Sequence, residues 1–448
     1  MKYGLWIALW SLCATHVSAE DWSQWLGNHR DGVYREKELL QVFPKEGPKV
    51  SWKIPCGMGY SGPSVAHGKV FFTDRQLAQK AANPANPFAV SGIQGNERIR
   101  CLEETTGKVL WEHEYPCEYR ISYPAGPRAT PTITEKHVFS LGAMGDFFCY
   151  EIKTGKILWE KHFLKDFNAS LPFWGFSAHP LAYNDTVICL AGGAQGKTVV
   201  AFDAATGKEK WSALNVGDPG YATPIIIELQ GKPQLIIWTP KAIYGLEPAS
   251  GKKIWSFDWT INSSLTAVVP RFVENRYLFF SAFYNGSLLL DVSGDQPKVV
   301  WKSKSKNNGS SVMPNNTLDL HSIMCTPWIA DGNIYGVCSY GELRCLDLLT
   351  GERKWFTHEP TSGKSLRWGH AFIIPTTEGF SYIFNEQGQL ITCHFSPKEY
   401  KEISRATILK PTNKMATGRP VVWTHPAFAN HHMIVRNDEE IIRISLQK

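Results

Sequence analysis

Six side chains that could bind a small molecule stand where long connecting segments lead into apolar runs: Arg128, Trp174, Tyr221, His321, His370 and Arg419. Guanidinium groups pair with anionic or hydroxyl-rich ligands, aromatic rings stack on flat groups, and imidazoles donate or accept protons near neutral pH. If they converge, these residues form a ligand-binding site.

An ordinary structural explanation competes with this interpretation. Arg128 and Arg419 could pair internally with acidic turn residues such as Glu342 or Asp438, which would leave a pocket that holds only water. The same entry positions also hold Tyr60, Trp368 and Trp423, and aromatic residues at such places often pack between sheets. His179 and His425, each before a proline, are typical of structural hydrogen bonding.

No catalytic pattern accompanies these residues. The sequence has no recognisable nucleophile triad, paired carboxylates or phosphate-binding loop, so the catalytic residues are unknown. It has no CxxC motif and no zinc-ligand spacing, so no metal site is predicted. Lys and Arg total 47 and Asp and Glu 41, and the net charge of +6 is spread along the chain, which argues against a nucleic-acid binder.

A repeated turn supplies the elements that would position the six residues. A Gly followed by Trp four residues later recurs, with the tryptophans 44 to 59 residues apart when the degenerate copies at Trp52 and Trp301 are included. The clear copies are Gly107 and Trp111, Gly155 and Trp159, Gly207 and Trp211, Gly251 and Trp255, and Gly351 and Trp355. Short apolar runs within such a period predict the four-stranded antiparallel blades of a β-propeller.

A second mark predicts the number of blades. A proline precedes or begins an apolar run eight times, with looser copies at Pro63, Pro270 and Pro375, and proline favours an edge strand such as the innermost strand of a blade. The last unit, near Arg419, lacks its Gly-x-x-x-Trp strand, whereas Val50 to Ile54 stands alone near the N-terminus. The sequence therefore predicts an eight-bladed, all-β propeller whose last blade is closed by the N-terminal strand.

The chain divides into three predicted parts. Residues 1–19 combine a basic start, an apolar stretch and a small-x-small exit, which predicts a signal peptide cleaved after Ala19. Residues 20–47 form a lead-in segment and residues 48–448 the propeller. No later segment is long and apolar enough to span a bilayer, so we expect a monomer that is exported to the periplasm or the extracellular space.

The irregular loops gather on one predicted face. The Thr-Gly-Lys turns are short, whereas long segments such as 75–97, 116–126, 305–320 and 359–368 would lie on the opposite face. Loops on rigid scaffolds often carry function. We therefore expect the ligand site at the central mouth of this irregular face.

The recurring Asp/Glu-x-x-Thr-Gly-Lys-x-x-Trp pattern, as in Asp203 to Trp211, resembles the PQQ-repeat propellers over residues 48 to 448. The opening Asp21-Trp22-Ser23-Gln24-Trp25-Leu26-Gly27 is similar to the lead-in of exported PQQ-like propellers of unassigned role. The resemblance implies three alternatives. One is a non-catalytic protein that binds a small molecule or an envelope protein and needs no cofactor. Another is a quinoprotein alcohol or sugar dehydrogenase with pyrroloquinoline quinone (PQQ) and calcium. The third is an envelope assembly scaffold. The chain lacks the adjacent cysteine pair typical of the dehydrogenases.

Overall fold

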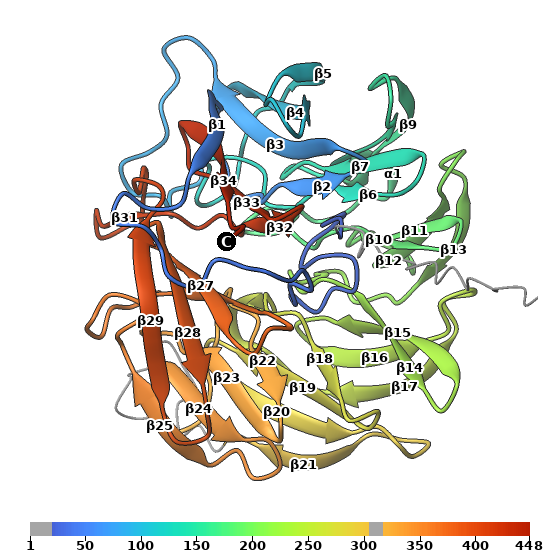
Figure 1. Cartoon of the computed structure of the whole chain (residues 1–448). Coiled ribbons are helices and arrows are strands. Elements are labelled where there is room, and N and C mark those ends of the chain that lie inside the picture. The colour runs from blue at the N-terminus through green and yellow to red at the C-terminus, as the bar shows by residue number, and fades with distance from the viewer. Residues whose placement is uncertain (1–19, 304–316) are drawn as a thin grey trace, which may run out of the picture.

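A computed structural model describes residues 20–303 and 317–448. The predicted signal peptide, residues 1–19, and most of the predicted link 305–320 lie outside the described residues. The described chain forms eight four-stranded antiparallel sheets arranged as a ring, which confirms the predicted propeller (Figure 1). In this described part no helix is long and apolar enough to cross a membrane.

Seven blades consist of four consecutive strands each. Within each of these blades, every strand pairs with the strand that follows it along the chain. Blades 1 to 4 are, from the inner to the outer strand, β2 (Ser64–Ala66), β3 (Lys69–Leu77), β4 (Gly95–Glu103) and β5 (Val109–Pro116); β6 (Thr132–Ile133), β7 (His137–Leu141), β8 (Asp146–Glu151) and β9 (Ile157–His162); β10 (Leu181–Tyr183), β11 (Thr186–Leu190), β12 (Val199–Asp203) and β13 (Glu209–Ala213); and β14 (Ile225–Leu229), β15 (Lys232–Trp238), β16 (Ala242–Leu246) and β17 (Lys253–Asp258).

Blades 5 to 7 are β18 (Arg271–Val273), β19 (Tyr277–Ala282), β20 (Gly286–Asp291) and β21 (Lys298–Lys302); β22 (Trp328–Ala330), β23 (Asn333–Val337), β24 (Leu343–Asp347) and β25 (Arg353–Thr357); and β26 (Ala371–Pro375), β27 (Ser381–Asn385), β28 (Gln389–Phe395) and β29 (Tyr400–Thr407). Minor elements are the one-turn helix α1 (Phe163–Asp166), the 3-10 turn η1 (Asn262–Ser264) and the ribbon of β30 (Asn413–Lys414) with β31 (Pro420–Val421).

Blade 8 is closed by the N-terminal strand, as predicted. It contains β32 (Ala427–Ala429), β33 (His432–Arg436), β34 (Glu440–Ser445) and, as its outer strand, β1 (Val50–Pro55). β1 lies antiparallel to β34, with Val50 opposite Ile444 and Pro55 opposite Glu440. In Figure 1 the blue β1 lies beside the red β34. The pairing joins two ends of the chain into one sheet.

One predicted strand start is wrong. Seven of the eight marked prolines lie directly before an inner strand, but Pro375 is the last residue of β26. The carbonyl oxygen of Pro375 accepts a hydrogen bond from the Tyr34 amide at 2.8 Å, outside the blade. Because a terminal proline on an edge strand costs no ladder hydrogen bond, the residue suits either end of the strand.

Five tryptophans of the repeated turns pack against the turn glycine of the next blade: Trp52, Trp111, Trp159, Trp211 and Trp301. A Cβ added at Gly207 would lie 2.6 Å from the ring of Trp159, and the Gly207 φ of +69° also disfavours any other residue. The Trp159 indole donates to the Ala204 carbonyl of blade 3 at 3.0 Å, and the Trp211 indole donates to the Pro248 carbonyl of blade 4 at 3.1 Å. The repeat therefore fastens neighbouring blades together.

Trp255 is an exception to this arrangement. Its indole donates to the Gln234 side chain of its own blade at 2.8 Å. The corresponding turn of blade 5 holds Gly294, whose nearest neighbouring atom for an added Cβ lies 3.9 Å away, so no ring packs there. The degenerate repeat copy before Trp301 thus coincides with the absence of a tryptophan–glycine contact between blades 4 and 5, which still share a hydrophobic cluster.

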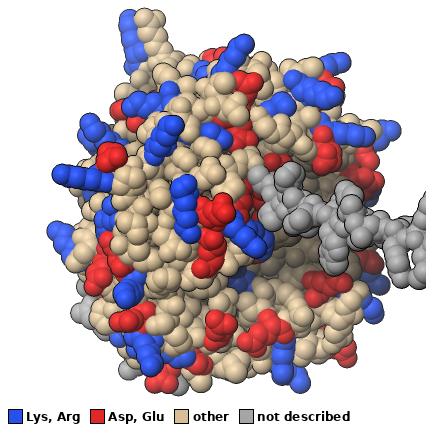
Figure 2. Space-filling model, in the orientation of Figure 1, with Lys and Arg blue, Asp and Glu red and all other residues tan. Residues whose placement is uncertain are grey.

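The lead-in segment crosses the centre of the ring. Trp22 pairs with Val65 of β2, and Tyr34 pairs with Thr376 beside β26. Between them, Arg30 is buried and donates to the carbonyls of Pro180 and Pro224, at the inner strands of blades 3 and 4. Figure 1 shows this dark blue segment inside the ring, and Figure 2 shows the same face with Lys and Arg interspersed among Asp and Glu. It closes the channel on the face where the first and second strands of each blade are connected.

Candidate functional site

A pocket of about 480 Å³ lies on the ring axis, within the range of typical small-molecule sites. Apart from Trp25, its lining comes from the segments that join successive blades, from the entry end of β26 and from the loops between second and third strands, which form the irregular face. Four tryptophans, four tyrosines and two phenylalanines dominate the wall: Trp25, Trp174, Trp368, Trp423, Tyr60, Tyr123, Tyr221, Tyr284, Phe88 and Phe372. The other lining residues are Arg128, Ser177, His179, Leu265, Ala267, Ile323, Met324 and Arg367.

Trp25 of the lead-in segment forms the inner end of the pocket. Its ring stacks on that of His179 at a centroid distance of 4.2 Å and an interplanar angle of 12°. It also contacts His425 at 4.7 Å between centroids. Trp25 of the lead-in thus covers the inner end of the pocket, and the irregular loops surround the other end.

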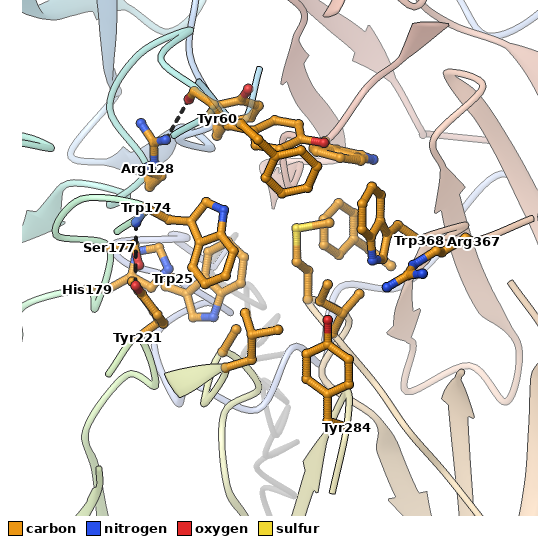
Figure 3. A pocket seen from close by; sticks show the side chains of 18 residues that line it. Trp25, Tyr60, Arg128, Trp174, Ser177, His179, Tyr221, Tyr284, Arg367 and Trp368 are labelled. Atoms are coloured by element: carbon orange, nitrogen blue, oxygen red, sulfur yellow. Dashed lines mark hydrogen bonds between the residues drawn. The ribbon is translucent and has the colours of Figure 1, made fainter. Parts of the chain in front are cut away.

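Three of the six predicted residues line this pocket. Arg128, Trp174 and Tyr221 are brought together on one side, where the Trp174 amide donates to the Tyr221 hydroxyl at 3.4 Å (Figure 3). The Trp174 and Tyr221 rings meet edge to face at 5.7 Å. Whether a ligand contacts them stays a prediction.

The other three predicted residues do not line it. His321 is fully buried and its ring nitrogens lie 3.0 Å from the Phe283 carbonyl and 3.2 Å from Asp319. His370 is buried, 3.6 Å from Glu386, and Arg419 forms an ion pair with the same carboxylate. The buried Glu386 therefore turns Arg419 away from the central pocket and into a smaller cavity beside it.

The structure also separates the two arginines from the acidic partners considered above. Glu342 pairs with Arg344, and the Asp438 carboxylate accepts from the Gly59 amide at 3.1 Å. Arg128 donates to backbone carbonyls instead, those of Gly126, Ser122 and Tyr123.

Two of the aromatic wall residues hold an unusual backbone conformation. Tyr123 has a φ of +54° and Trp368 a φ of +60°. Among the described residues they are the only Phe, Tyr or Trp with positive φ, and both line the pocket. Such a conformation costs a bulky residue about 1–3 kcal/mol. The position of these two rings in the pocket wall is therefore obtained at a cost in conformational stability.

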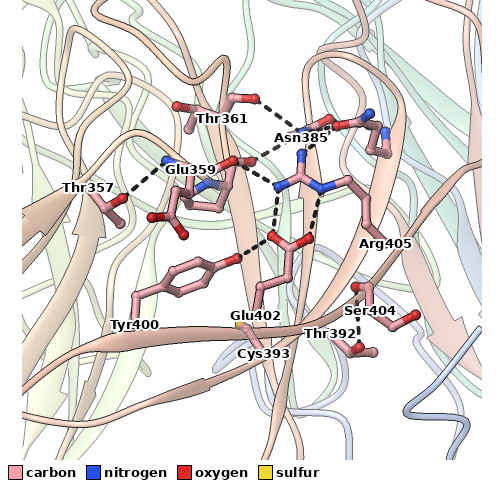
Figure 4. A network of polar contacts seen from close by, with 12 residues as sticks. Thr357, Glu359, Thr361, Asn385, Thr392, Cys393, Tyr400, Glu402, Ser404 and Arg405 are labelled. Carbon is pink, nitrogen blue, oxygen red and sulfur yellow. Dashed lines mark hydrogen bonds and ion pairs between the residues drawn. The ribbon is translucent and has the colours of Figure 1, made fainter.

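A polar network holds the link that carries Trp368 (Figure 4). Arg405 of β29 pairs with Glu402 through two nitrogens, at 3.0 and 2.7 Å, and donates to the Glu359 carbonyl at 2.8 Å. Thr361 donates to the Gly341 carbonyl at 2.6 Å, and the Trp368 amide donates to the Ser339 carbonyl at 2.7 Å. These contacts to blades 6 and 7 hold the link at Glu359, at Thr361 and at Trp368 itself.

Two buried histidines, His179 in the pocket lining and His425 next to Trp25, stay neutral at physiological pH. Burial lowers the pKa of His425 to about 4, although its ring hydrogen bond to the Pro426 carbonyl opposes the shift. Burial, the Arg30 guanidinium and His425 hold the pKa of His179 well below its usual value. The Nδ1 of His179 accepts a hydrogen bond from the Thr130 amide at 2.7 Å.

We expect the free energy of unfolding to decrease as the pH falls from about 6.5 to about 4. In this window the unfolded histidine takes up a proton that the buried neutral His425 does not, which favours the unfolded state by about 1.4 kcal/mol per pH unit. The His425→Asn variant should show a correspondingly smaller slope in denaturant titrations at each pH. Exposed His394→Asn is the control, and an unchanged slope in His425→Asn would contradict the prediction.

Among the aromatic and charged wall residues, sequence reasoning missed five: Trp25, Phe88, Tyr123, Arg367 and Phe372. Tyr123 and Arg367 lie within the links 116–126 and 359–368, which the sequence predicts to be on the irregular face. Phe88 lies in the 75–97 insertion and Trp25 in the lead-in, and neither segment has a counterpart in the other blades. Of these residues, only Trp25 lies in a recognisable sequence motif, Asp21 to Gly27, which is similar to the lead-in of other propellers.

Solved structures with the same fold include BamB from Moraxella catarrhalis, with 13% identity, a TM-score of 0.56, and 89% of this chain and 99% of that chain covered. Quinohemoprotein alcohol dehydrogenase from Comamonas testosteroni has 11% identity and a TM-score of 0.63 over 95% of this chain and 80% of that chain. A europium-containing methanol dehydrogenase has 12% identity and a TM-score of 0.62 over 95% and 89%. At these identities the likeness shows the fold alone.

No curated protein sequence matches the chain. A family model does, over residues 95–357, and its description is outer membrane protein assembly factor BamB. This match covers more than half of the chain and includes the clear Gly-x-x-x-Trp copies from Gly107 to Trp355. The protein therefore belongs to this family of PQQ-repeat β-propellers.

Proposed function

We propose that this protein is a non-catalytic, exported binding protein that takes a small ligand in its central aromatic pocket. The observation that carries the proposal is the central cavity of about 480 Å³ with ten aromatic rings in its wall, two of them on strained backbone. The chemistry-bearing side chains nearby support binding over catalysis, because His321, His370 and Arg419 are held in buried contacts away from the cavity.

The residues that line the pocket argue against the quinoprotein alternative. Calcium prefers carboxylate and carbonyl oxygens, and the eighteen lining residues include neither Asp nor Glu. The donor set of the pocket therefore does not fit a calcium ion, although the rings and guanidinium groups suit a flat anionic molecule. The assembly-scaffold alternative draws support from the family description, and it predicts binding of an envelope protein on the same irregular face.

The Trp368→Gly variant tests the proposal. Glycine tolerates the φ of +60°, so relief of strain offsets much of the lost packing, and we expect a melting temperature within a few degrees of wild type. Compounds that quench tryptophan fluorescence of the wild type should bind at least tenfold more weakly to this variant. Phe356→Gly on β25 is the control, because Phe356 is exposed and lies outside the pocket lining.

Three results would contradict the proposed function. Compounds that bind wild type and Trp368→Gly equally would place binding elsewhere. Dye-linked oxidation of alcohols or sugars that depends on added PQQ and calcium would favour the dehydrogenase. Co-purification with outer-membrane proteins that Trp368→Gly leaves unchanged would favour the scaffold.

A further inference from the structure

Glu36 of the lead-in segment is a buried carboxylate that gathers hydrogen-bond donors from three parts of the chain. Its side chain is only 2% exposed. It accepts from the Tyr34 hydroxyl at 2.8 Å and from the Glu20 nitrogen at 3.2 Å. The backbone amides of Asn430 and His431, in the turn between β32 and β33, donate to the same carboxylate. Glu36 therefore connects the first described residue to the rest of the lead-in and to blade 8.

No lysine or arginine in the described ranges forms an ion pair with Glu36. Its one ion-pair partner there is His431, an imidazole that is charged only when protonated and whose Nδ1 lies 3.3 Å away. Glu97, another buried carboxylate without such a partner, accepts from two tyrosine hydroxyls, and burial raises its pKa. Because a buried charge without a counter-charge is costly, Glu36 favours a cation beside it. Four other buried carboxylates have a guanidinium partner: Asp74 with Arg98, Glu104 with Arg443, Glu342 with Arg344 and Glu386 with Arg419.

The Glu20 nitrogen becomes such a cation when the chain is cut where the sequence predicts. Hydrolysis of the peptide bond between Ala19 and Glu20 adds the hydroxyl of water to the Ala19 carbonyl carbon and the hydrogen to the Glu20 nitrogen. The new carboxylic acid then releases a proton and the new amine takes one up, because an α-amine has a pKa of about 7.7–8.0. A neutral amide before the cut is thus an ammonium group afterwards, on the atom that lies 3.2 Å from the Glu36 carboxylate.

We infer that removal of the predicted signal peptide completes an ion pair between the terminal ammonium of Glu20 and Glu36, which fastens the lead-in segment inside the ring. The segment between these two residues carries Trp22, which pairs with Val65 of β2, and Trp25, which forms the inner end of the pocket. Processing therefore stabilises the part of the chain that completes the central pocket. The inference holds whatever the pocket binds.

The pH dependence of this ion pair follows from the amine. The Glu36 carboxylate should raise the pKa of the amine above its ordinary value of about 7.7–8.0. While Glu36 is ionised, the ion pair contributes its full stability below that ordinary value and loses it as the pH rises through the raised pKa. The other ionisable groups that face Glu36 or Glu20 are the same before and after the cut, so they cancel when the two forms are compared. They are His29, Tyr34, Arg35, His431 and His432.

Amine labelling tests the ion pair directly. A chain that begins at Glu20 is released from a fusion protein by a protease that cuts before this residue, and is treated with acetic anhydride at about pH 7. Mass spectrometry of the N-terminal peptide gives the labelling rate of its amine. Only the unprotonated amine reacts, so a pKa higher by one unit lowers the rate about tenfold. We expect the amine to react at least about tenfold more slowly in wild type than in Glu36→Gln. Glu38→Gln is the matched control, because it removes an exposed carboxylate from the same segment and should leave the rate unchanged.

Thermal unfolding gives a second readout that needs no substitution. Residues 20–448 are compared with residues 18–448, which keep Ser18 and Ala19 and therefore have an amide nitrogen at Glu20. We expect the shorter chain to melt at least about 2 °C higher at about pH 7 and the difference to vanish at about pH 10.5. The difference should also vanish when both chains carry Glu36→Gln, and should persist when both carry Glu38→Gln.

Four results would overturn the inference. They are equal labelling rates in wild type and Glu36→Gln, equal melting temperatures of the two chains at about pH 7, a difference that is unchanged at about pH 10.5, and an exported protein whose mass shows a first residue other than Glu20. If Glu36→Gln does not fold, the comparison of the two wild-type chains at both pH values still decides.

Discussion

A chain that lacks residues 20–55 is expected to lose its soluble folded form. The deletion removes β1, the outer strand of blade 8, and exposes the edge of β34 that now pairs with it from Glu440 to Ile444. It also removes Trp52, whose indole donates to the Glu104 carbonyl of blade 1 at 2.7 Å, and the segment that fills the channel. Net stabilities of about 5–15 kcal/mol leave little room for such losses.

The measurement is the soluble fraction after expression, followed by size-exclusion chromatography and near-ultraviolet circular dichroism. Co-expression of residues 20–55 as a separate fragment is the control, because the fragment carries the whole strand and lead-in and should restore part of the soluble protein. A soluble monomer of the truncated chain with wild-type near-ultraviolet spectra would show that the closure contributes little.

Trp159→Ala is expected to lower the free energy of unfolding by about 3–5 kcal/mol. The side chain is buried, it packs against Gly207 of the next blade, and its indole hydrogen bond to Ala204 would be lost with it. The cavity cannot collapse easily, because the surrounding sheets are fixed by their own ladders.

Guanidinium chloride unfolding followed by circular dichroism gives the value. Leu158→Ala is the control, since Leu158 is the adjacent residue of β9, is 41% exposed and should change stability by less than about 1 kcal/mol. A loss in Trp159→Ala as small as that of the control would show that the contact between blades is not a main source of stability.

The repeat made the architecture predictable because its signals are local. The contact between blades requires a glycine with positive φ and a tryptophan four residues later. Each copy of this pattern therefore indicates one blade. The closure of blade 8 by β1 was predictable because the last repeat unit lacks its outer strand, whereas one such strand stands alone near the N-terminus. Pro375 misled because proline marks an edge strand without saying which end it occupies.

The site was predictable only in part, because the links between blades do not repeat. Their positions placed Arg128, Trp174 and Tyr221 at the mouth, but the direction of a side chain depends on contacts distant in sequence. Glu386, buried in the loop after β27, draws Arg419 away from the pocket. Trp25, at the inner end of the pocket, belongs to the lead-in segment, which has no counterpart in the blades. The repeat pattern therefore could not predict its position.

The pairing of β1 with β34 also sets an order of events during synthesis. Seven complete blades lie between the two strands in the chain, so β1 leaves the ribosome long before its partner exists. Contacts this distant in sequence carry a large loop-closure cost and form late. The intervening blades can assemble one after another as they emerge, while β1 and the lead-in wait without a sheet to join. The ring is completed only once β34 has been made, and until then the nascent chain remains an open arc.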